Sequence, residues 1–302
     1  MTDRGFFLTR GAIQRQVAAM PCDLYLVRLI HQPTRRAFPG ERLWTAAQLA
    51  HDATVRFLRI RNREGCDVYI QPFAAHRNAG YILLDLDHTA PTVVQTMRAN
   101  GHEPCLVLQT SPGNLQAWVR VSPAPLEPAV ATAVARHLAR TYGGDWGSAD
   151  GRHLGRLAGF TNQKPRRSLP SGQAPWVSVV HTTASLARNA GALLEAASRL
   201  PAPAGVTTQE VAPTSITGVQ ALEIYQCWMQ RWRITERYAP PDWSIVDLWI
   251  AGDLLAQGRP AGEVAAIVRL GSPQFPRRHG NPEDYLRRTL ARAAFPAPRR
   301  AV

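Results

Sequence analysis

The segment from residue 201 to residue 216 divides the chain into two parts with different patterns. It is rich in Pro, Thr, Ala and Gly and lacks apolar periodicity, which is typical of an extended linker. Strand and helix patterns alternate before it, whereas only helix patterns follow it. The 302-residue sequence therefore predicts an α+β domain over residues 1–200, a linker over 201–216 and a small all-α helical bundle over 217–297.

Hydrophobic periodicity and turn residues define the expected elements. Strands are predicted at residues 23–30, 67–71, 80–86, 105–110, 116–121 and 176–181. Helices are predicted at residues 12–20, 45–61, 91–99, 127–142, 185–200, 218–236, 245–257, 261–270 and 282–294. The strands at 67–71 and 80–86 are expected to be neighbours, and those at 105–110 and 116–121 to form a hairpin.

The charge balance indicates a polyanionic partner. Lys and Arg number 35 against 22 Asp and Glu, which gives a net charge of +13, and a domain this basic most often binds nucleic acid. No apolar run reaches the roughly 18 residues of a membrane span, and the N-terminus lacks a signal-peptide core. We therefore expect a cytoplasmic protein with no membrane partner. The four cysteines form no C-x-x-C pair, which argues against a zinc site.

Residues 81–88 join an apolar run to two carboxylates. The run predicts a buried central strand that ends in Asp85 and Asp87, and the i, i+2 spacing places both on one side of it. Two like charges at the edge of an apolar core repel each other, and a bridging divalent cation relieves the repulsion. The alternative is a strand that runs into a solvated turn, where Asp is common.

The loop at residues 145–173 has an uneven charge pattern. Asp145 and Asp150 open it, but no Asp or Glu occurs from residue 151 to residue 194. Six cations occupy that stretch: Arg152, Arg156, Lys164, Arg166, Arg167 and Arg188. The asymmetry favours a triphosphate or nucleic-acid phosphate site, and the alternative is a solvated basic loop.

Lys164 is the only lysine among the 35 basic residues. GC-rich coding explains many arginines but not the exception. A compact ammonium on a flexible stem suits a phosphate as a point charge, where the planar fork of an arginine does not fit. The lone lysine therefore indicates a specific role in phosphate binding, with codon chance as the alternative.

The hairpin turn carries polar groups of its own. Ser111 and Asn114 flank a Pro-Gly pair, so the turn amides and these side chains are candidates for nucleotide contact. Trp118 follows in the second strand, where a core position is the favoured interpretation and base stacking the alternative.

Taken together, three acids, a hairpin and a basic loop suit nucleotidyl transfer. Carboxylates hold divalent ions that activate an attacking 3′-hydroxyl and steady a leaving pyrophosphate, while cations hold the triphosphate. The sequence contains no P-loop, no G-x-S-x-G elbow and no H-x-H pair. These absences argue against NTPases of the P-loop type, serine hydrolases and nicking enzymes.

The chain resembles the RepB-type plasmid replication primases of the archaeo-eukaryotic primase superfamily. The resemblance covers nearly the whole chain and is most specific in GCDVYIQP, TSPGNLQAWVRV and SADGRHLGRLAGFTNQK. It implies a catalytic domain with an RNA-recognition-motif-like sheet. It also implies a helical domain that helps to recognise a single-stranded hairpin origin.

The same resemblance implies the roles of individual residues. Asp85, Asp87 and Asp145 would hold Mg²⁺ or Mn²⁺, and Asp150 is the rival third acid. Nucleotide or template contacts would come from Ser111, Asn114, Gln116, Asp150, Arg152, His153, Arg156, Asn162 and Lys164. DNA contacts of the helical domain would come from Arg277, Arg278, Arg287 and Arg288. Its aromatic residues are interpreted as bundle core rather than as a stacking platform.

We therefore expect a DNA primase that makes short primers on single-stranded DNA from nucleoside triphosphates, for a plasmid or another mobile element. A primase-polymerase that mainly extends primers is one alternative. A non-catalytic origin-binding replication protein is another, and an accessory module of a DNA-nicking relaxase is a third. A replicative helicase or a relaxase is the expected protein partner.

Overall fold

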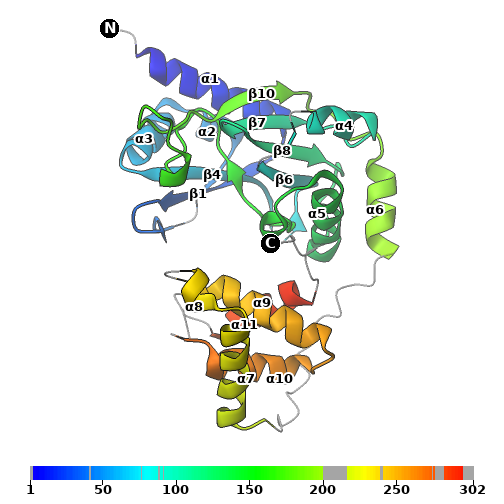
Figure 1. Cartoon of the computed structure of the whole chain (residues 1–302). Helices are drawn as coiled ribbons and strands as arrows, with labels where there is room; N and C mark the ends of the chain where they lie inside the picture. The colour runs from blue at the N-terminus through cyan, green and yellow to red at the C-terminus, as the bar shows by residue number, and fades with distance from the viewer. Residues whose placement is uncertain are drawn as a thin grey trace. The chain divides into compact units, whose positions relative to one another are not determined.

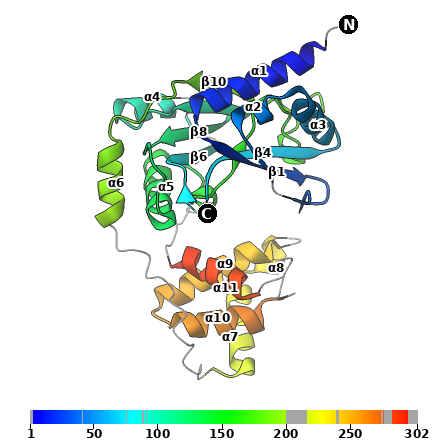
Figure 2. The ribbon, with the colours of Figure 1, turned by 180° about the vertical axis from the view of Figure 1, so that it is seen from behind.

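The computed structural model describes residues 3–40, 42–75, 77–87, 89–90, 92–199, 216–238, 241–273, 275 and 282–294. The chain divides near residue 201 into two compact units (Figures 1 and 2). The first unit combines helices with two antiparallel sheets and the second is helical, which confirms the α+β prediction. Residues 201–215 of the predicted linker lie outside the described residues.

The first sheet is built on a long antiparallel pair, β1 and β4, which is matched over eight residues. Its strands are β1 (Leu24–His31), β2 (Arg36–Ala37), β3 (Arg42–Trp44), β4 (Cys66–Ala74), β5 (Arg77–Asn78) and β9 (Gly155–Arg156). One face packs against α1 (Arg4–Ala19), α2 (Ala46–Leu49) and α3 (Asp52–Arg63). Alternation along β4 sends Val68 and Ile70 into that core, so Asp67 and Tyr69 point to the other face.

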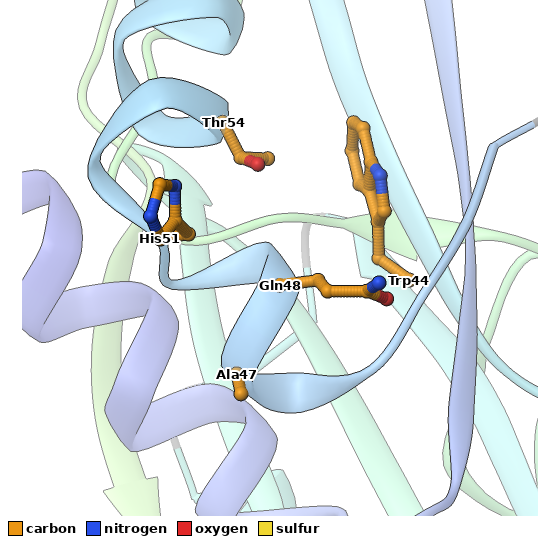
Figure 3. A pocket seen from close by; sticks show the side chains of 5 residues that line it. All are labelled: Trp44, Ala47, Gln48, His51 and Thr54. Carbon is orange, nitrogen blue, oxygen red and sulfur yellow. The ribbon is translucent and has the colours of Figure 1, made fainter.

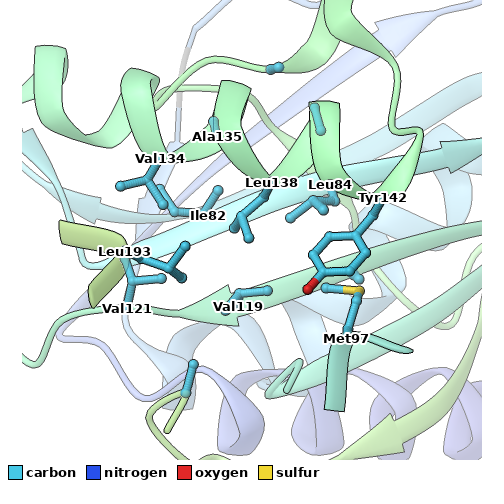
Figure 4. Packing of buried hydrophobic residues seen from close by; sticks show 14 of the residues in the cluster. Ile82, Leu84, Met97, Val119, Val121, Val134, Ala135, Leu138, Tyr142 and Leu193 are labelled. Atoms are coloured by element: carbon cyan, nitrogen blue, oxygen red, sulfur yellow. The ribbon is translucent and has the colours of Figure 1, made fainter. Parts of the chain in front are cut away.

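The second sheet has the strand order β10-β7-β8-β6. Its strands are β6 (Tyr81–Asp87), β7 (Leu106–Ser111), β8 (Asn114–Arg120) and β10 (Ser178–Thr182). The surrounding helices are α4 (Val93–Ala99), α5 (Pro128–Tyr142) and α6 (Ala190–Arg199). Ile82 and Leu84 of β6 pack against Val134 and Leu138 of α5 (Figure 4), and this core holds the carboxylate-bearing end of β6 in place.

The predicted neighbours at 67–71 and 80–86 are wrong, because these strands lie in different sheets. β4 pairs with β1, β5 and β9, whereas β6 pairs with β8. The chain turns sharply between them at Gly80, whose φ is 87°. An added Cβ there would lie 2.2 Å from the Ser122 carbonyl oxygen. The expected β7–β8 hairpin is confirmed.

Two predicted helices are interrupted or shifted at their start. The 45–61 helix ends after one capped turn at Ala50 and restarts with His51 as the N-cap of α3. The first helix starts earlier than predicted, at Arg4, because the Asp3 side chain caps it. Hydrophobic periodicity shows neither capping by a histidine nor the tertiary packing of the N-terminus.

The helical unit consists of α7 (Gly218–Arg231), α8 (Ile234–Arg237), α9 (Trp243–Ala256), α10 (Ala261–Gly271) and α11 (Pro282–Ala293). The predicted 218–236 helix breaks at Arg233, whose φ is 52°. Tyr225 and Trp228 are buried in the bundle core, but Trp249 is 41% exposed, so the core interpretation holds for part of the aromatic set. No described helix is long and apolar enough to cross a membrane.

Candidate active site

Two carboxylates lie at the end of β6, as the i, i+2 spacing predicts. Asp85 is opposite Gln116 of β8, and Asp87 is opposite Asn114. Register in a buried sheet fixes which face each side chain occupies. The strand end therefore places two acids beside two amides of the neighbouring strand.

Asp145 joins these acids through the main chain. Its backbone N–H donates to the Asp85 carbonyl oxygen at 2.8 Å. The Asp145 carboxylate accepts a hydrogen bond from the Gly147 amide at 3.0 Å, which begins the short helix η1 (Trp146–Ser148). Asp150 instead accepts from the Arg152 amide at 2.8 Å and lies 3.4 Å from His153 Nδ1.

The electrostatics of Asp85 reflect crowding of like charges. Burial raises the pKa of the Asp85 carboxyl, and the charges of Asp87 and Asp145 raise it further. Lys164 and His153 act in the opposite direction. Asp145, the nearer candidate for a third acid, thus belongs to the same charged group as the strand carboxylates.

A buried ion pair anchors the basic loop. The Arg156 guanidinium donates to both carboxylate oxygens of Asp67, at 2.7 and 2.9 Å. Arg156 is 3% exposed and Asp67 is fully buried. Burial raises the pKa of Tyr69 to about 12, so its hydroxyl stays protonated and donates to Asp67 at 3.3 Å.

The backbone of Arg156 connects three further parts of the domain. Its N–H donates to Gln116 Oε1 at 2.8 Å, and its carbonyl accepts from Gln16 of α1 at 3.1 Å. The adjoining Gly155 passes so close to Trp118 that an added Cβ would lie 2.7 Å from the indole ring. Trp118 is 1% exposed, which confirms its core position.

The same anchor positions Lys164. The Gln163 amide donates to Asp67 at 2.7 Å. The Asn162 side chain donates to the Thr110 carbonyl at 3.0 Å and accepts from the Lys164 amide at 3.2 Å. Burial lowers the pKa of the Lys164 ammonium, Arg156 lowers it further, and Asp85 raises it. The lone lysine therefore lies within electrostatic range of Asp85.

Two of the residues predicted to contact a ligand have buried side chains in the structure. The sequence predicts that Arg156 and Asn162 touch nucleotide or template, but their side chains are buried and bonded within the protein. Both fix the loop instead of presenting a free donor. The sequence displays their polarity but not the burial that the β4–β9 pairing imposes.

Arg167 is a site residue that the charge pattern of the loop does not single out. It belongs to the short helix η2 (Pro165–Arg167) and forms an ion pair with Asp87. Asp67 is a second residue that the sequence pattern missed, although a carboxylate inside the apolar strand 67–71 was an available signal. In the described part of the chain, no group of three or more His, Cys, Asp or Glu side chains is arranged as a metal centre.

The hairpin residues are close to the acids and are buried. Asn114 donates to Ser111 Oγ at 2.8 Å and to the Pro112 carbonyl at 2.9 Å. Its Oδ1 is buried and has no partner among the described residues. An unpaired buried acceptor is costly, which makes Asn114 a candidate for ligand contact.

The structure describes two of the four arginines that are predicted to contact DNA in the helical unit. Arg287 and Arg288 lie on the exposed surface of α11 and pair with Asp284. Arg277 and Arg278 lie outside the described residues.

Replacing Asp67 with Asn should destabilise the first unit by about 3–5 kcal/mol, because it leaves the buried Arg156 charge uncompensated. Urea unfolding followed by circular dichroism measures the loss. Glu127→Gln is the matched control, since its Arg77 pair is more than half exposed on both sides and is worth about 1 kcal/mol or less. Equal effects of the two substitutions would contradict an anchoring role.

Asp85→Asn should stabilise the protein near neutral pH. The folded pKa of Asp85 is raised above its unfolded value, so the ionised carboxylate opposes folding above that pKa. The stability gain should shrink as the pH falls from the folded pKa of Asp85 to below its unfolded pKa, where the carboxyl is neutral in both states. Urea midpoints near pH 7 and about pH 4 measure it; a gain independent of pH would refute the charge explanation.

The comparisons with known proteins identify the family of the chain. Residues 41–199 match the RepB DNA-primase N-terminal domain, and residues 241–293 match the RepB DNA-primase C-terminal helical domain. Mobilization protein A of Escherichia coli is 32% identical over 295 residues, which cover 94% of this chain. The chain spans only 40% of the length of that relative.

Two solved structures are also similar. The crystal structure of primase RepB′ is 32% identical, with a TM-score of 0.58 and 94% of both chains covered. The catalytic domain of primase RepB′ in complex with initiator DNA is 36% identical, with a TM-score of 0.55; the match covers 63% of this chain and 93% of that one. The family match extends over more than half of the chain and confirms the resemblance noted in the sequence: the protein belongs to the RepB DNA-primase family.

Proposed function

We propose that this chain is a DNA primase that makes short primers on single-stranded DNA for a plasmid or another mobile element. The observation that carries the proposal is the grouping of Asp85 and Asp87 at the end of β6 with Asp145, whose backbone N–H bonds the Asp85 carbonyl, with Lys164 within electrostatic range of Asp85. A cation fixed beside a cluster of carboxylates suits a nucleoside triphosphate and its metal ions. Membership of the RepB primase family supports the same activity.

The donor set fits a divalent cation. The charges of Asp87 and Asp145 raise the pKa of Asp85, and hard oxygen ligands are those that Mg²⁺ and Mn²⁺ prefer. Because the described side chains are not arranged as a metal centre, the three carboxylates would have to move closer together to bind one ion. We assign these three residues as the metal ligands. When bound, the ions supply activation of the primer 3′-hydroxyl and charge neutralisation on the triphosphate.

The chain's own side chains would orient the nucleotide. Lys164 provides a point charge for a phosphate, and Arg152 and His153 lie on the same loop. Arg167 pairs with one oxygen of the Asp87 carboxylate, so a cation bound to Asp87 would compete with this ion pair. Ser111 and Asn114 of the hairpin, next to Gln116, are proposed to contact the sugar or base. Arg156 and Asn162 act by positioning Lys164.

DNA binding is the second part of the proposal. The net charge of +13 suits phosphate contacts, and the related catalytic domain was crystallised with initiator DNA. We propose that residues 217–297 assist recognition of a hairpin origin, with Arg277, Arg278, Arg287 and Arg288 as phosphate contacts. A helicase or relaxase partner stays a prediction.

Asp85→Ala or Asp87→Ala should abolish primer synthesis on circular single-stranded DNA with labelled nucleotides and Mg²⁺ or Mn²⁺. DNA binding, followed by fluorescence anisotropy, should stay close to wild type because the acids hold metal and not template. Asp145→Asn should behave like the strand variants, whereas Asp150→Asn should keep activity. Full synthesis by the Asp85 and Asp87 variants would overturn the site. A wild type that binds an origin hairpin but makes no product there would favour the non-catalytic alternative.

Lys164→Arg should raise the KM for nucleoside triphosphate by about tenfold, because the guanidinium is larger and its donors diverge. Steady-state primer synthesis over a nucleotide series measures this change. Arg166→Lys is the matched control, since Arg166 is exposed on the same loop. Wild-type kinetics for Lys164→Arg would show that the single lysine reflects codon usage and not a role in phosphate binding.

A further inference from the structure

A second concave site lies on the first unit, away from the acids. Trp44 of β3, Ala47 and Gln48 of α2, and His51 and Thr54 at the start of α3 line a cavity of about 410 Å³. Figure 3 shows the Trp44 ring on one side of the space and His51 on the other. An aromatic wall with polar groups opposite it suits a flat, partly polar ligand.

The polar groups of this cavity are donors. Nδ1 of His51 accepts the Ala53 amide, so the neutral ring carries its proton on Nε2. Oε1 of Gln48 accepts the Thr45 amide at 2.9 Å, which leaves the side-chain NH₂ to donate. These donors match the ring nitrogens and carbonyl oxygens of a nucleobase.

Cations continue the site along the same strand and helix. Arg42 is two residues before Trp44 on β3 and shares its face. The Arg42 guanidinium lies 5.1 Å from the Phe57 ring and 5.5 Å from the Phe38 ring. Arg61 follows Thr54 and Phe57 on the same face of α3, and its guanidinium lies 5.2 Å from the Phe38 ring. Arg61 also pairs with Glu64 at 2.8 Å. We call the cavity together with the Arg42 and Arg61 guanidinium groups the groove; cations held on aromatic rings beside a cavity suit a nucleic-acid backbone.

The charge of α3 reinforces this complementarity. The helix carries four arginines, at positions 56, 59, 61 and 63, and one acid, Asp52. Arg56 and Arg59 lie over Phe6 of α1, and Arg59 pairs with Asp3, so Arg61 is the arginine of α3 that lies near Phe38 and Phe57. Cations beside an aromatic wall suit single-stranded nucleic acid rather than an apolar protein partner.

This groove is separate from the active site. Trp44 is opposite Tyr25 in the sheet, and Tyr25 belongs to the core on the helix-covered face. Asp67 and Tyr69 point to the other face. A contact at Trp44 therefore serves recognition and not the chemistry.

We infer that the cavity takes one unpaired base of single-stranded DNA, stacked on Trp44, and that Arg42 and Arg61 hold the adjacent phosphates. The inference deepens the DNA binding proposed above and rests on it. The occupant is single-stranded DNA, because the aromatic wall suits an unpaired base and the neighbouring guanidinium groups suit its phosphates.

The test measures binding of the full chain without metal or nucleotide, by anisotropy of a labelled oligothymidylate of about 20 nucleotides. Trp44→Ala should weaken binding about tenfold, the range of one lost stacking contact, and Trp44→Phe should restore most of it. Trp176→Ala is the control, because Trp176 is an exposed tryptophan, at 43%, that does not line the cavity. Arg42→Gln should lower the slope of log K against log salt by about 0.7, whereas Trp44→Ala should leave the slope unchanged.

Unchanged affinity of folded Trp44→Ala overturns the inference, as does a loss confined to free nucleotide added as a second probe. Photocrosslinking of wild type to 5-iodouracil DNA, read by mass spectrometry, needs no variant; a crosslink at Trp44 supports the inference and its absence contradicts it. Primer synthesis by the wild type is scored separately. Synthesis with unchanged Trp44→Ala binding would reject only this inference, and no synthesis with weakened binding would reject only the catalytic proposal.

Discussion

The bidentate ion pair between Asp67 and Arg156 is the interaction on which the rest of the first unit depends. Its two residues are buried, so each charge needs the other. The pair holds β9 on the first sheet, while the Arg156 backbone bonds Gln116 of the second sheet and Gln16 of α1. Arg156 thus connects two sheets and a helix. This connection fixes the position of the loop that follows.

This anchor allows the site to hold charges that oppose folding. Burial and the charges of Asp87 and Asp145 raise the pKa of Asp85, and burial lowers the pKa of Lys164, so the fold disfavours the charged form of both groups. Arg167 balances Asp87 in the absence of another cation. Such an arrangement costs stability and is retained where function needs it. The carboxylates, the lysine and the exchangeable arginine together suit a site that receives a metal-bound triphosphate.

Local patterns predicted part of this site and not its connections. The i, i+2 spacing indicated the common side of Asp85 and Asp87, and the Ser-Pro-Gly-Asn turn indicated the hairpin. The lone lysine singled out Lys164, and Asp85 acts on its pKa. Asp67 was missed because its partner is 89 residues away in sequence, and Arg156 was misassigned because charge patterns do not show burial. The separate sheets of β4 and β6 and the breaks at His51 and Arg233 depend on tertiary contacts and on single backbone angles, which periodicity does not report.

The most direct measurement of the central claim is Mn²⁺ binding to the full chain, followed by electron paramagnetic resonance with and without nucleoside triphosphate. The account predicts that the wild type binds Mn²⁺, more tightly with nucleotide, and that Asp85→Asn and Asp87→Asn each reduce the bound signal strongly. It also predicts that Asp150→Asn binds as the wild type does. Equal Mn²⁺ binding by the wild type and the Asp85 and Asp87 variants would contradict the assignment of the β6 carboxylates as the metal site.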